Sequence, residues 1–180
     1  MRVIAGRYGG RRLVAPAGRL VRPTADRVRE ALFSILGDLR GVDVLDLFAG
    51  SGALGIEALS RGAARAVFVE QAAAASAAIT ANLTALGVPP DTVELRRRDV
   101  FAALRAAREA RETYDLVFID PPYRHAAALG SELTNALGPL LAPGAWVVTE
   151  SDRRSPLPLD LGSADERRYG DTVINIHHLP

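Results

Sequence analysis

Hydrophobic and polar positions change their period along the chain, and these changes predict where strands and helices lie. Between residues 42 and 149, short apolar runs alternate with longer stretches that have helical spacing. Strands are expected at 42–48, 66–70, 92–99, 115–120 and 145–149, and helices at 54–61, 72–86, 100–112 and 125–141. Five strands that alternate with helices predict an open, mostly parallel α/β sheet with helices on both faces.

The two ends of the chain depart from this alternation. Near the C-terminus, apolar residues on both sides of Gly170 predict an antiparallel hairpin, which brings the sheet to seven strands. At the N-terminus, the apolar pairs of residues 3–4 and 13–14 flank Gly9-Gly10 and predict a β-hairpin over residues 2–15. A helix is expected from Thr24, a candidate N-cap, to Gly37. We therefore expect a hairpin extension at residues 1–22 and a main domain at residues 23–180.

Charge adds a candidate partner to this picture. The 180 residues carry a net charge of +1 and all 22 basic residues are arginine, but residues 1–29 hold eight arginines against one acid. A basic arm on a mildly acidic body is typical of proteins that bind nucleic acid, although an arginine-biased composition with a solvated N-terminus is the alternative. The arginines expected to contact RNA phosphates are Arg2, Arg7, Arg11, Arg12, Arg22, Arg27 and Arg29.

Composition also excludes several kinds of site. The chain has no cysteine and only three histidines, so we expect neither disulfides nor a metal centre. His177 and His178 are expected at a solvent-exposed edge. No apolar run approaches the roughly 18 residues of a membrane span, and the N-terminus lacks a secretory signal. We expect a cytoplasmic monomer without membrane partners.

A glycine loop follows the first predicted strand and indicates a nucleotide-like cofactor. Gly50, Gly52 and Gly55 match G-x-G-x-x-G, and Glu70 ends the next strand, where an acid can hold ribose hydroxyls. Taken alone, this pattern also fits a nicotinamide oxidoreductase. Asp46, however, would repel a pyrophosphate and favours a cofactor that carries a sulfonium and an ammonium group. The loop also resembles the first motif of class I methyltransferases, which use S-adenosylmethionine.

The residues expected at the cofactor come from the ends of three strands. Asp99 could accept a hydrogen bond from the adenine amino group or could simply cap the next helix, and the Val100 amide lies nearby. The cofactor contacts are expected from Asp46, Phe48, Ala49, Gly50, Ser51, Gly52, Glu70, Gln71, Asp99 and Val100.

The fourth strand ends in Asp120-Pro121-Pro122-Tyr123, which resembles the D/N-P-P-Y/F motif of amino-group methyltransferases. Two prolines stiffen the backbone, so Asp120 and the Pro121 carbonyl can accept hydrogen bonds from an exocyclic amine and aim its lone pair. Tyr123 can stack on an extruded base. Asp120 favours guanine, which presents two donors side by side, whereas adenine places an acceptor beside its amine.

Most of the chain resembles the bacterial rRNA methyltransferase RsmD family, in residues 2–14, 22–33, 45–62, 120–123 and 169–172. The resemblance implies a Rossmann-like class I methyltransferase that transfers a methyl group from S-adenosylmethionine to a guanine N2 of 16S rRNA. It further implies that the N-terminal extension docks on small-subunit rRNA, within a protein-bound assembly intermediate of the 30S subunit. An N6-adenine DNA or RNA methyltransferase and a non-catalytic RNA-binding assembly factor are the alternatives.

Overall fold

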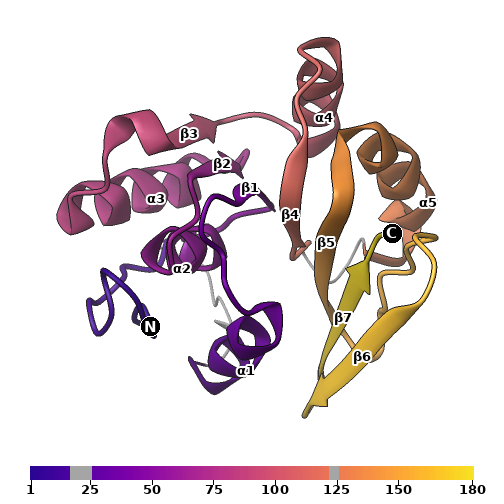
Figure 1. Ribbon diagram of the computed structural model, residues 1–180, viewed down its shortest axis with the longest axis horizontal. Coiled ribbons are helices and arrows are strands. Elements are labelled where there is room, and N and C mark those ends of the chain that lie inside the picture. Colours follow the sequence, from indigo (N-terminus) through magenta and orange to yellow (C-terminus); the bar gives the residue numbers. More distant parts are fainter. Residues whose placement is uncertain (17–25, 122–125) are drawn as a thin grey trace.

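The computed structural model describes residues 1–16, 26–121 and 126–180 of the chain, and its centre is a seven-stranded sheet (Figure 1). The strand order is β3-β2-β1-β4-β5-β7-β6; the first five strands are parallel, and β7 and β6 are antiparallel to their neighbours. The strands are β1 (Asp43–Leu47), β2 (Arg65–Val69), β3 (Val93–Arg96), β4 (Tyr114–Ile119), β5 (Leu141–Asp152), β6 (Ala164–Tyr169) and β7 (Thr172–His178).

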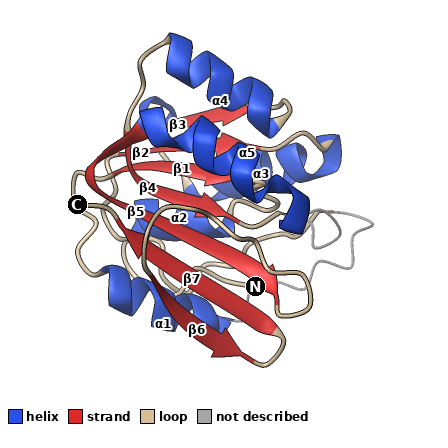
Figure 2. Cartoon of the chain, turned by 90° about the vertical axis from the view of Figure 1, so that its right-hand side faces the viewer, coloured by secondary structure: helices blue, strands red, loops and turns tan. Residues whose placement is uncertain are grey.

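Helices cover both faces of this sheet (Figure 2). One hydrophobic core joins the sheet to α1 (Asp26–Leu36), α2 (Ala53–Ser60) and α3 (Ala73–Leu86). The other core joins it to α4 (Val100–Glu109) and α5 (Ala126–Leu137). Two short 3-10 turns complete the described elements, η1 (Pro90–Thr92) and η2 (Gly138–Leu140).

The central strands are apolar on both faces because each face packs against helices. On β2, Phe68 points into the core with α1–α3, whereas Val67 and Val69 point into the core with α4 and α5. This arrangement explains the continuous apolar runs in the sequence. Asp46 on β1 interrupts one of these runs and is nevertheless only 2% exposed.

The predicted Rossmann-like fold with its C-terminal antiparallel hairpin is confirmed. Figure 1 shows β6 and β7 side by side beyond β5. The expected position of the histidines is wrong for His177, which is 5% exposed. The reason is that β7 lies between β5 and β6 and is therefore not an edge strand. His178 is exposed and stacks on Trp146 with 4.2 Å between the ring centroids.

The predicted N-terminal hairpin is present but short: the Val3 amide donates to the Arg11 carbonyl and the Leu13 amide to the Met1 carbonyl, while the rest of the segment bonds to the helices. Only one antiparallel bridge, between Arg2 and Arg12, joins its two arms in the described part. Val3, Tyr8 and Leu13 are buried in the same core as α1 and α2, so the N-terminal segment packs against the helices of the main domain. Thr24, the predicted N-cap, lies outside the described residues.

Among the described residues, no helix combines the length and the hydropathy that crossing a membrane requires. In the same parts of the chain, no group of three or more histidine, aspartate or glutamate side chains could hold a metal ion.

Candidate active site

The candidate site lies where the parallel strands end, at the boundary between β1 and β4. Leu47 is paired with Ile119, so Phe48 and Asp120 follow the paired residues on adjacent strands. Along the chain, β2 and β3 are added on one side of β1, and β4 and β5 are then added on its other side, so the strand order switches side at the β1/β4 boundary. Open α/β sheets bind their ligands at such a switch point. The topology therefore brings the glycine loop and the start of the D-P-P-Y motif to one edge.

The loop from Phe48 to Gly52 has an unusual backbone. Gly50 and Gly52 have φ angles of +59° and +76°, which glycine adopts freely, but Phe48 also lies in the left-handed region with φ of +58°. Such a conformation costs about 1–3 kcal/mol in a residue with a side chain and is often found at functional sites. The Ala49 amide donates to the Val69 carbonyl at 3.1 Å and fixes the loop against β2.

Asp46 is the buried acid beneath this loop. Its Oδ2 accepts a hydrogen bond from the Gly55 amide at 3.0 Å, at the start of α2. Burial raises the pKa of Asp46 to about 8; the Gly55 bond opposes this shift and the nearby Glu70 carboxylate adds to it. A Cβ at Gly55 would lie 2.4 Å from the Phe68 ring, so this glycine serves the packing of α2 on β2.

Glu70 is the second acid, at the end of β2, and it holds the loop by hydrogen bonds. It is 5% exposed, and its carboxylate accepts from the Gly50 amide at 3.0 Å and from the Ala72 amide at 2.7 Å. Gln71, beside it, is exposed. The Glu70 carboxylate would repel a pyrophosphate and attract a cation, and a cation beside Asp46 would favour its charged form over the protonated form that burial favours. These acidic groups therefore fit S-adenosylmethionine better than a dinucleotide.

Asp99 caps α4, the structural role that the sequence left open. Its Oδ1 accepts from the Ala102 amide at 3.1 Å, and Val100, the first residue of α4, is buried. Because a carboxylate that accepts one hydrogen bond keeps further acceptor capacity, capping is compatible with a contact to an adenine amino group.

The D-P-P-Y motif is described only in its first half. Asp120 is half-buried and Pro121 is buried at the end of β4. Pro122 and Tyr123 lie outside the described residues, so their predicted contacts stay predictions.

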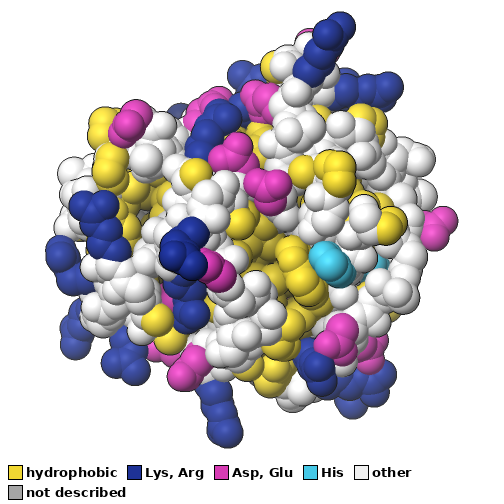
Figure 3. All heavy atoms as spheres, in the orientation of Figure 1, with side chains coloured by type: hydrophobic (Ala, Val, Ile, Leu, Met, Phe, Trp, Pro, Cys, Tyr) yellow, Lys and Arg dark blue, Asp and Glu magenta, His cyan; other side chains and the backbone are white. Residues whose placement is uncertain are grey.

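The predicted RNA-binding arginines separate into exposed and buried members. Arg7, Arg11, Arg12 and Arg27 are exposed. Arg2 is 64% exposed and its Nε lies 3.3 Å from an Asp26 oxygen. Figure 3 shows basic side chains gathered over the N-terminal segment and around α4. Arg22 lies outside the described residues.

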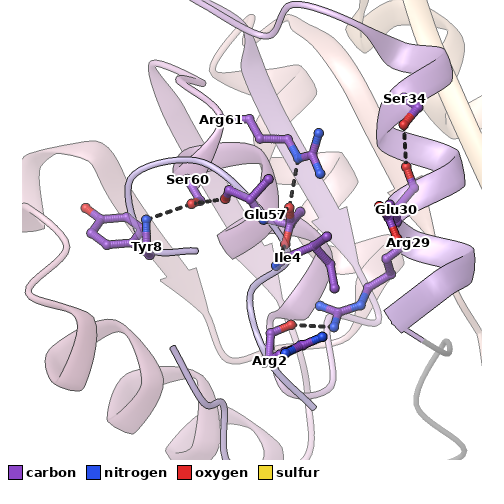
Figure 4. A network of polar contacts seen from close by, with 10 residues as sticks. Arg2, Ile4, Tyr8, Arg29, Glu30, Ser34, Glu57, Ser60 and Arg61 are labelled. Carbon is purple, nitrogen blue, oxygen red and sulfur yellow. Dashed lines mark hydrogen bonds and ion pairs between the residues drawn. The ribbon is translucent and has the colours of Figure 1, made fainter. Parts of the chain in front are cut away.

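The prediction that Arg29 contacts phosphates is wrong in this structure, because its side chain is fully buried. Arg29 belongs to the buried stripe of α1, together with Val28, Leu32 and Phe33. Its Nη2 donates to the Arg2 carbonyl at 2.5 Å (Figure 4). The same Nη2 donates to Asp26 Oδ1 at 2.8 Å. Although burial opposes the shift, these arginine contacts lower the pKa of Asp26. Arg29 thus fixes the N-terminal segment to α1.

Polar residues of α2 that the sequence analysis missed hold the same segment (Figure 4). Glu57 is fully buried and accepts from the Ile4 amide at 2.7 Å, from the Ala5 amide at 3.1 Å and from Arg61 Nε at 2.8 Å. One turn later, Ser60 Oγ accepts from the Tyr8 amide at 2.9 Å. The sequence contained a signal for these residues, because Glu57 and Ser60 are polar positions within the otherwise apolar run 53–60.

Comparison with known proteins agrees with this geometry. The sequence profile of the family described as "conserved hypothetical protein 95" matches residues 1–178. The ribosomal RNA small subunit methyltransferase D of Escherichia coli K12 is 38% identical over 161 residues, which cover 88% of this chain and 78% of that protein.

Solved structures share the fold over most of the chain. A hypothetical protein of Thermus thermophilus superposes with a TM-score of 0.84 at 33% identity, over 98% of each chain. The T. thermophilus 16S rRNA N2 G1207 methyltransferase (RsmC), solved with AdoMet and guanosine, gives 0.68 at 25% identity, over 91% of this chain and 44% of that one. The chain therefore belongs to the conserved hypothetical protein 95 family, the family of the ribosomal RNA small subunit methyltransferases D.

Proposed function

We propose that this protein transfers a methyl group from S-adenosylmethionine to the exocyclic N2 of a guanine in small-subunit rRNA. The observation that carries the proposal is the juxtaposition at the β1/β4 boundary. There, Asp120 and Pro121 follow β4 beside a glycine loop that two buried carboxylates flank. The relatives named above support rRNA as the substrate class, and the guanosine complex of the T. thermophilus enzyme supports guanine.

Each acid has a separate task toward the cofactor. Glu70, already aligned by the Gly50 and Ala72 amides, would hold the ribose hydroxyls. Asp46 would face the cationic end, and Asp99 or the Val100 amide would contact the adenine. When bound, S-adenosylmethionine supplies an electrophilic methyl group on a positively charged sulfur. The Glu70 carboxylate favours this charge over the phosphates of a dinucleotide, and the charge in turn favours the ionised form of Asp46.

The target nitrogen needs orientation, because its lone pair is delocalised into the purine ring. The Asp120 carboxylate and the Pro121 carbonyl would accept hydrogen bonds from the amine and turn its lone pair toward the methyl group. Guanine offers N1–H and N2–H₂ together, which suits the carboxylate of Asp120. Adenine would place its N1 lone pair against that carboxylate, so we rank N6-adenine methylation second.

The N-terminal segment would provide the RNA contacts. Arg7, Arg12 and Arg27 present exposed guanidinium groups, and phosphate contacts of this kind orient a protein on RNA without reading its sequence. The N-terminal segment is bonded to α2 and is not a free arm, so it presents its arginines in a fixed arrangement. Such an arrangement suits rRNA that ribosomal proteins already hold in a defined shape. We therefore propose an assembling small subunit as the substrate.

Methyl transfer to small subunits that lack the modification tests the proposal. With methyl-labelled cofactor, we expect label on guanine N2 after nuclease digestion. Asp120→Ala should lower kcat by about 100-fold or more, because aligned electrostatic contacts of this kind contribute on that scale. Cofactor affinity should stay close to that of the wild type.

Asp152→Asn provides a matched control, since Asp152 ends the neighbouring strand β5 and accepts from the Arg154 amide. This variant should methylate normally. Label on adenine or on protein, or full activity of Asp120→Ala, would contradict the proposal.

A further inference from the structure

Asn82 lies in the middle of α3 and is 1% exposed, in a helix composed mainly of alanine and other apolar residues. A buried amide has to satisfy its donors and acceptors, so its partners indicate its role. They come from two segments that are far apart in the sequence, the N-terminal segment and the glycine loop.

Three hydrogen bonds of good length define this junction. Asn82 Oδ1 accepts from the Val14 amide at 2.8 Å, and its Nδ2 donates to the Val14 carbonyl at 3.0 Å. The same Nδ2 donates to the Ser51 carbonyl at 3.0 Å. One amide group therefore binds both backbone groups of Val14 and a backbone carbonyl of the candidate cofactor site.

The junction continues to the cofactor acids on one side and to the basic surface on the other. Ser51 is only 6% exposed and follows Gly50, whose amide is held by Glu70. Val14 follows Arg11 and Arg12, and the Arg11 guanidinium donates to the Ala85 carbonyl of α3 at 2.8 Å. A short chain of contacts thus joins Glu70, the acid proposed to hold the ribose hydroxyls, to the N-terminal arginines.

Ser51 Oγ also donates weakly to Met1 Sδ at 3.9 Å, but the anchors of the N-terminal segment on α2 do not reach this loop. Ser60 Oγ accepts from the Tyr8 amide and donates to the Ala5 carbonyl at 2.5 Å, and its carbonyl accepts from the Arg7 amide at 2.7 Å (Figure 4). These bonds hold the segment on α2 alone. Asn82 differs because it binds the segment and the loop with one side chain.

We propose that Asn82 is a positioning residue that couples rRNA binding on the N-terminal segment to cofactor binding at the glycine loop. The inference rests on the proposed function, because it takes S-adenosylmethionine and rRNA as the two ligands. Cofactor that contacts the loop acts on Ser51, and through the hydrogen bonds of Asn82 this contact reaches the end of the basic segment at Val14. Since coupling between two binding sites is reciprocal, rRNA bound to the segment tightens the cofactor by the same factor.

The test measures this factor directly. The affinity for S-adenosylhomocysteine is determined by calorimetry for the free enzyme and for the enzyme on unmethylated small subunits. In the wild type we expect the subunit to tighten binding by about 5-fold or more, the lower end of common couplings. In Asn82→Ala the factor should fall to about 2 or less, while the free enzyme still binds S-adenosylhomocysteine.

Ser60→Ala is the matched control, because it removes bonds to the same segment without touching the loop. It should keep the coupling of the wild type at a similar loss of stability. Asn82→Ser, which also lacks the amide and leaves a smaller cavity, replaces Asn82→Ala should that variant not fold. In steady-state assays, an Asn82 variant should raise KM for the subunit far more than it lowers kcat.

The outcomes separate this inference from the proposed function. Unchanged coupling in both Asn82 variants, equal loss in Ser60→Ala, or no coupling in the wild type would overturn the inference while methyl transfer still stands. A wild-type enzyme that neither binds S-adenosylhomocysteine nor methylates rRNA would overturn the proposed function itself.

Discussion

The two ends of the chain are attached to the same sheet in opposite ways. The C-terminal strands β7 and β6 continue the sheet by regular backbone pairing, with seven residue pairs between β5 and β7 alone. The N-terminal segment has one bridge and a few backbone bonds of its own and is attached to the rest of the protein by side chains of the helices, chiefly Glu57, Ser60 and Asn82. Backbone pairing tolerates most side chains, whereas a side-chain anchor depends on single residues.

This difference has a functional consequence. A segment held by a few buried polar groups has a defined position but can be altered by one substitution. The C-terminal hairpin has no such weak point, because many bonds would have to break together. If the N-terminal segment meets RNA, as proposed, its anchors are places where binding can be tuned without damage to the sheet.

Glu57→Ala should have the largest effect on stability. The substitution leaves the amides of Ile4 and Ala5 and the Arg61 guanidinium without their buried carboxylate. Removing one partner from a buried ion pair costs about 3–5 kcal/mol of unfolding free energy. Urea denaturation measures this loss, and hydrogen exchange should show faster exchange at the amides of residues 4–8.

The corresponding change on the hairpin is Glu166→Ala, which removes the exposed ion pair with Arg168 on β6. Exposed pairs contribute about 0–1 kcal/mol, so this variant should unfold almost like the wild type. Equal losses in the two variants would show that side-chain anchors are no more critical at the N-terminus than at the C-terminus.

Gly6→Ala and Gly170→Ala extend the comparison to the backbone. Both glycines have positive φ angles, +82° and +63°, but a Cβ at Gly6 would lie 1.9 Å from the Ser60 carbonyl oxygen, and a Cβ at Gly170 would meet nothing within 4 Å. Gly170→Ala should therefore cost only about 1 kcal/mol for the left-handed conformation.

The Gly6 variant adds a backbone clash to the same conformational cost, and we expect a loss of roughly 2–3 kcal/mol. Urea denaturation of the two variants under identical conditions decides the matter. A Gly6→Ala protein as stable as Gly170→Ala would mean that the segment can move away from α2 at little cost.

Sequence patterns predicted the sheet well because its strands are buried on both faces and alternate with helices. The period of the apolar residues then determines the element type, as in β2 and β4. The N-terminal segment was predicted less well, since its two arms pair only over residues 1–3 and 10–13 and its other backbone groups bond to α2 and α3. Local patterns contain no information about such distant partners.

The same limit applies to the site residues. Motif spacing predicted Asp46, Glu70 and Asp120 as site residues, and the strand ends place them at the same edge of the sheet whatever their side-chain contacts. Charge counting grouped Arg29 with the exposed arginines, although its position on the buried stripe of α1 makes it structural. Asn82 was not identified, since a single polar residue in an alanine-rich helix has no distinguishing sequence pattern.

The last prediction concerns pH and contrasts a buried acid of β1 with a buried base in the hairpin. Burial raises the pKa of Asp46 from 3.8 to about 8, so between those values the folded protein retains a proton that the unfolded chain releases. Stability should therefore fall as pH rises through this range. Burial lowers the pKa of His177 from 6.5, so stability should also fall as pH drops below about 6.5.

Two substitutions separate these opposing slopes. Asp46→Asn keeps an acceptor for the Gly55 amide but cannot ionise, so near pH 8.5 it should be more stable than the wild type by at least about 1 kcal/mol. It should also bind S-adenosylhomocysteine less tightly. His177→Gln should remove the loss of stability below pH 6.5 and leave the alkaline side unchanged. Denaturation curves from pH 5 to pH 9 measure both slopes, and a wild-type profile in either variant would refute the assignment of that slope.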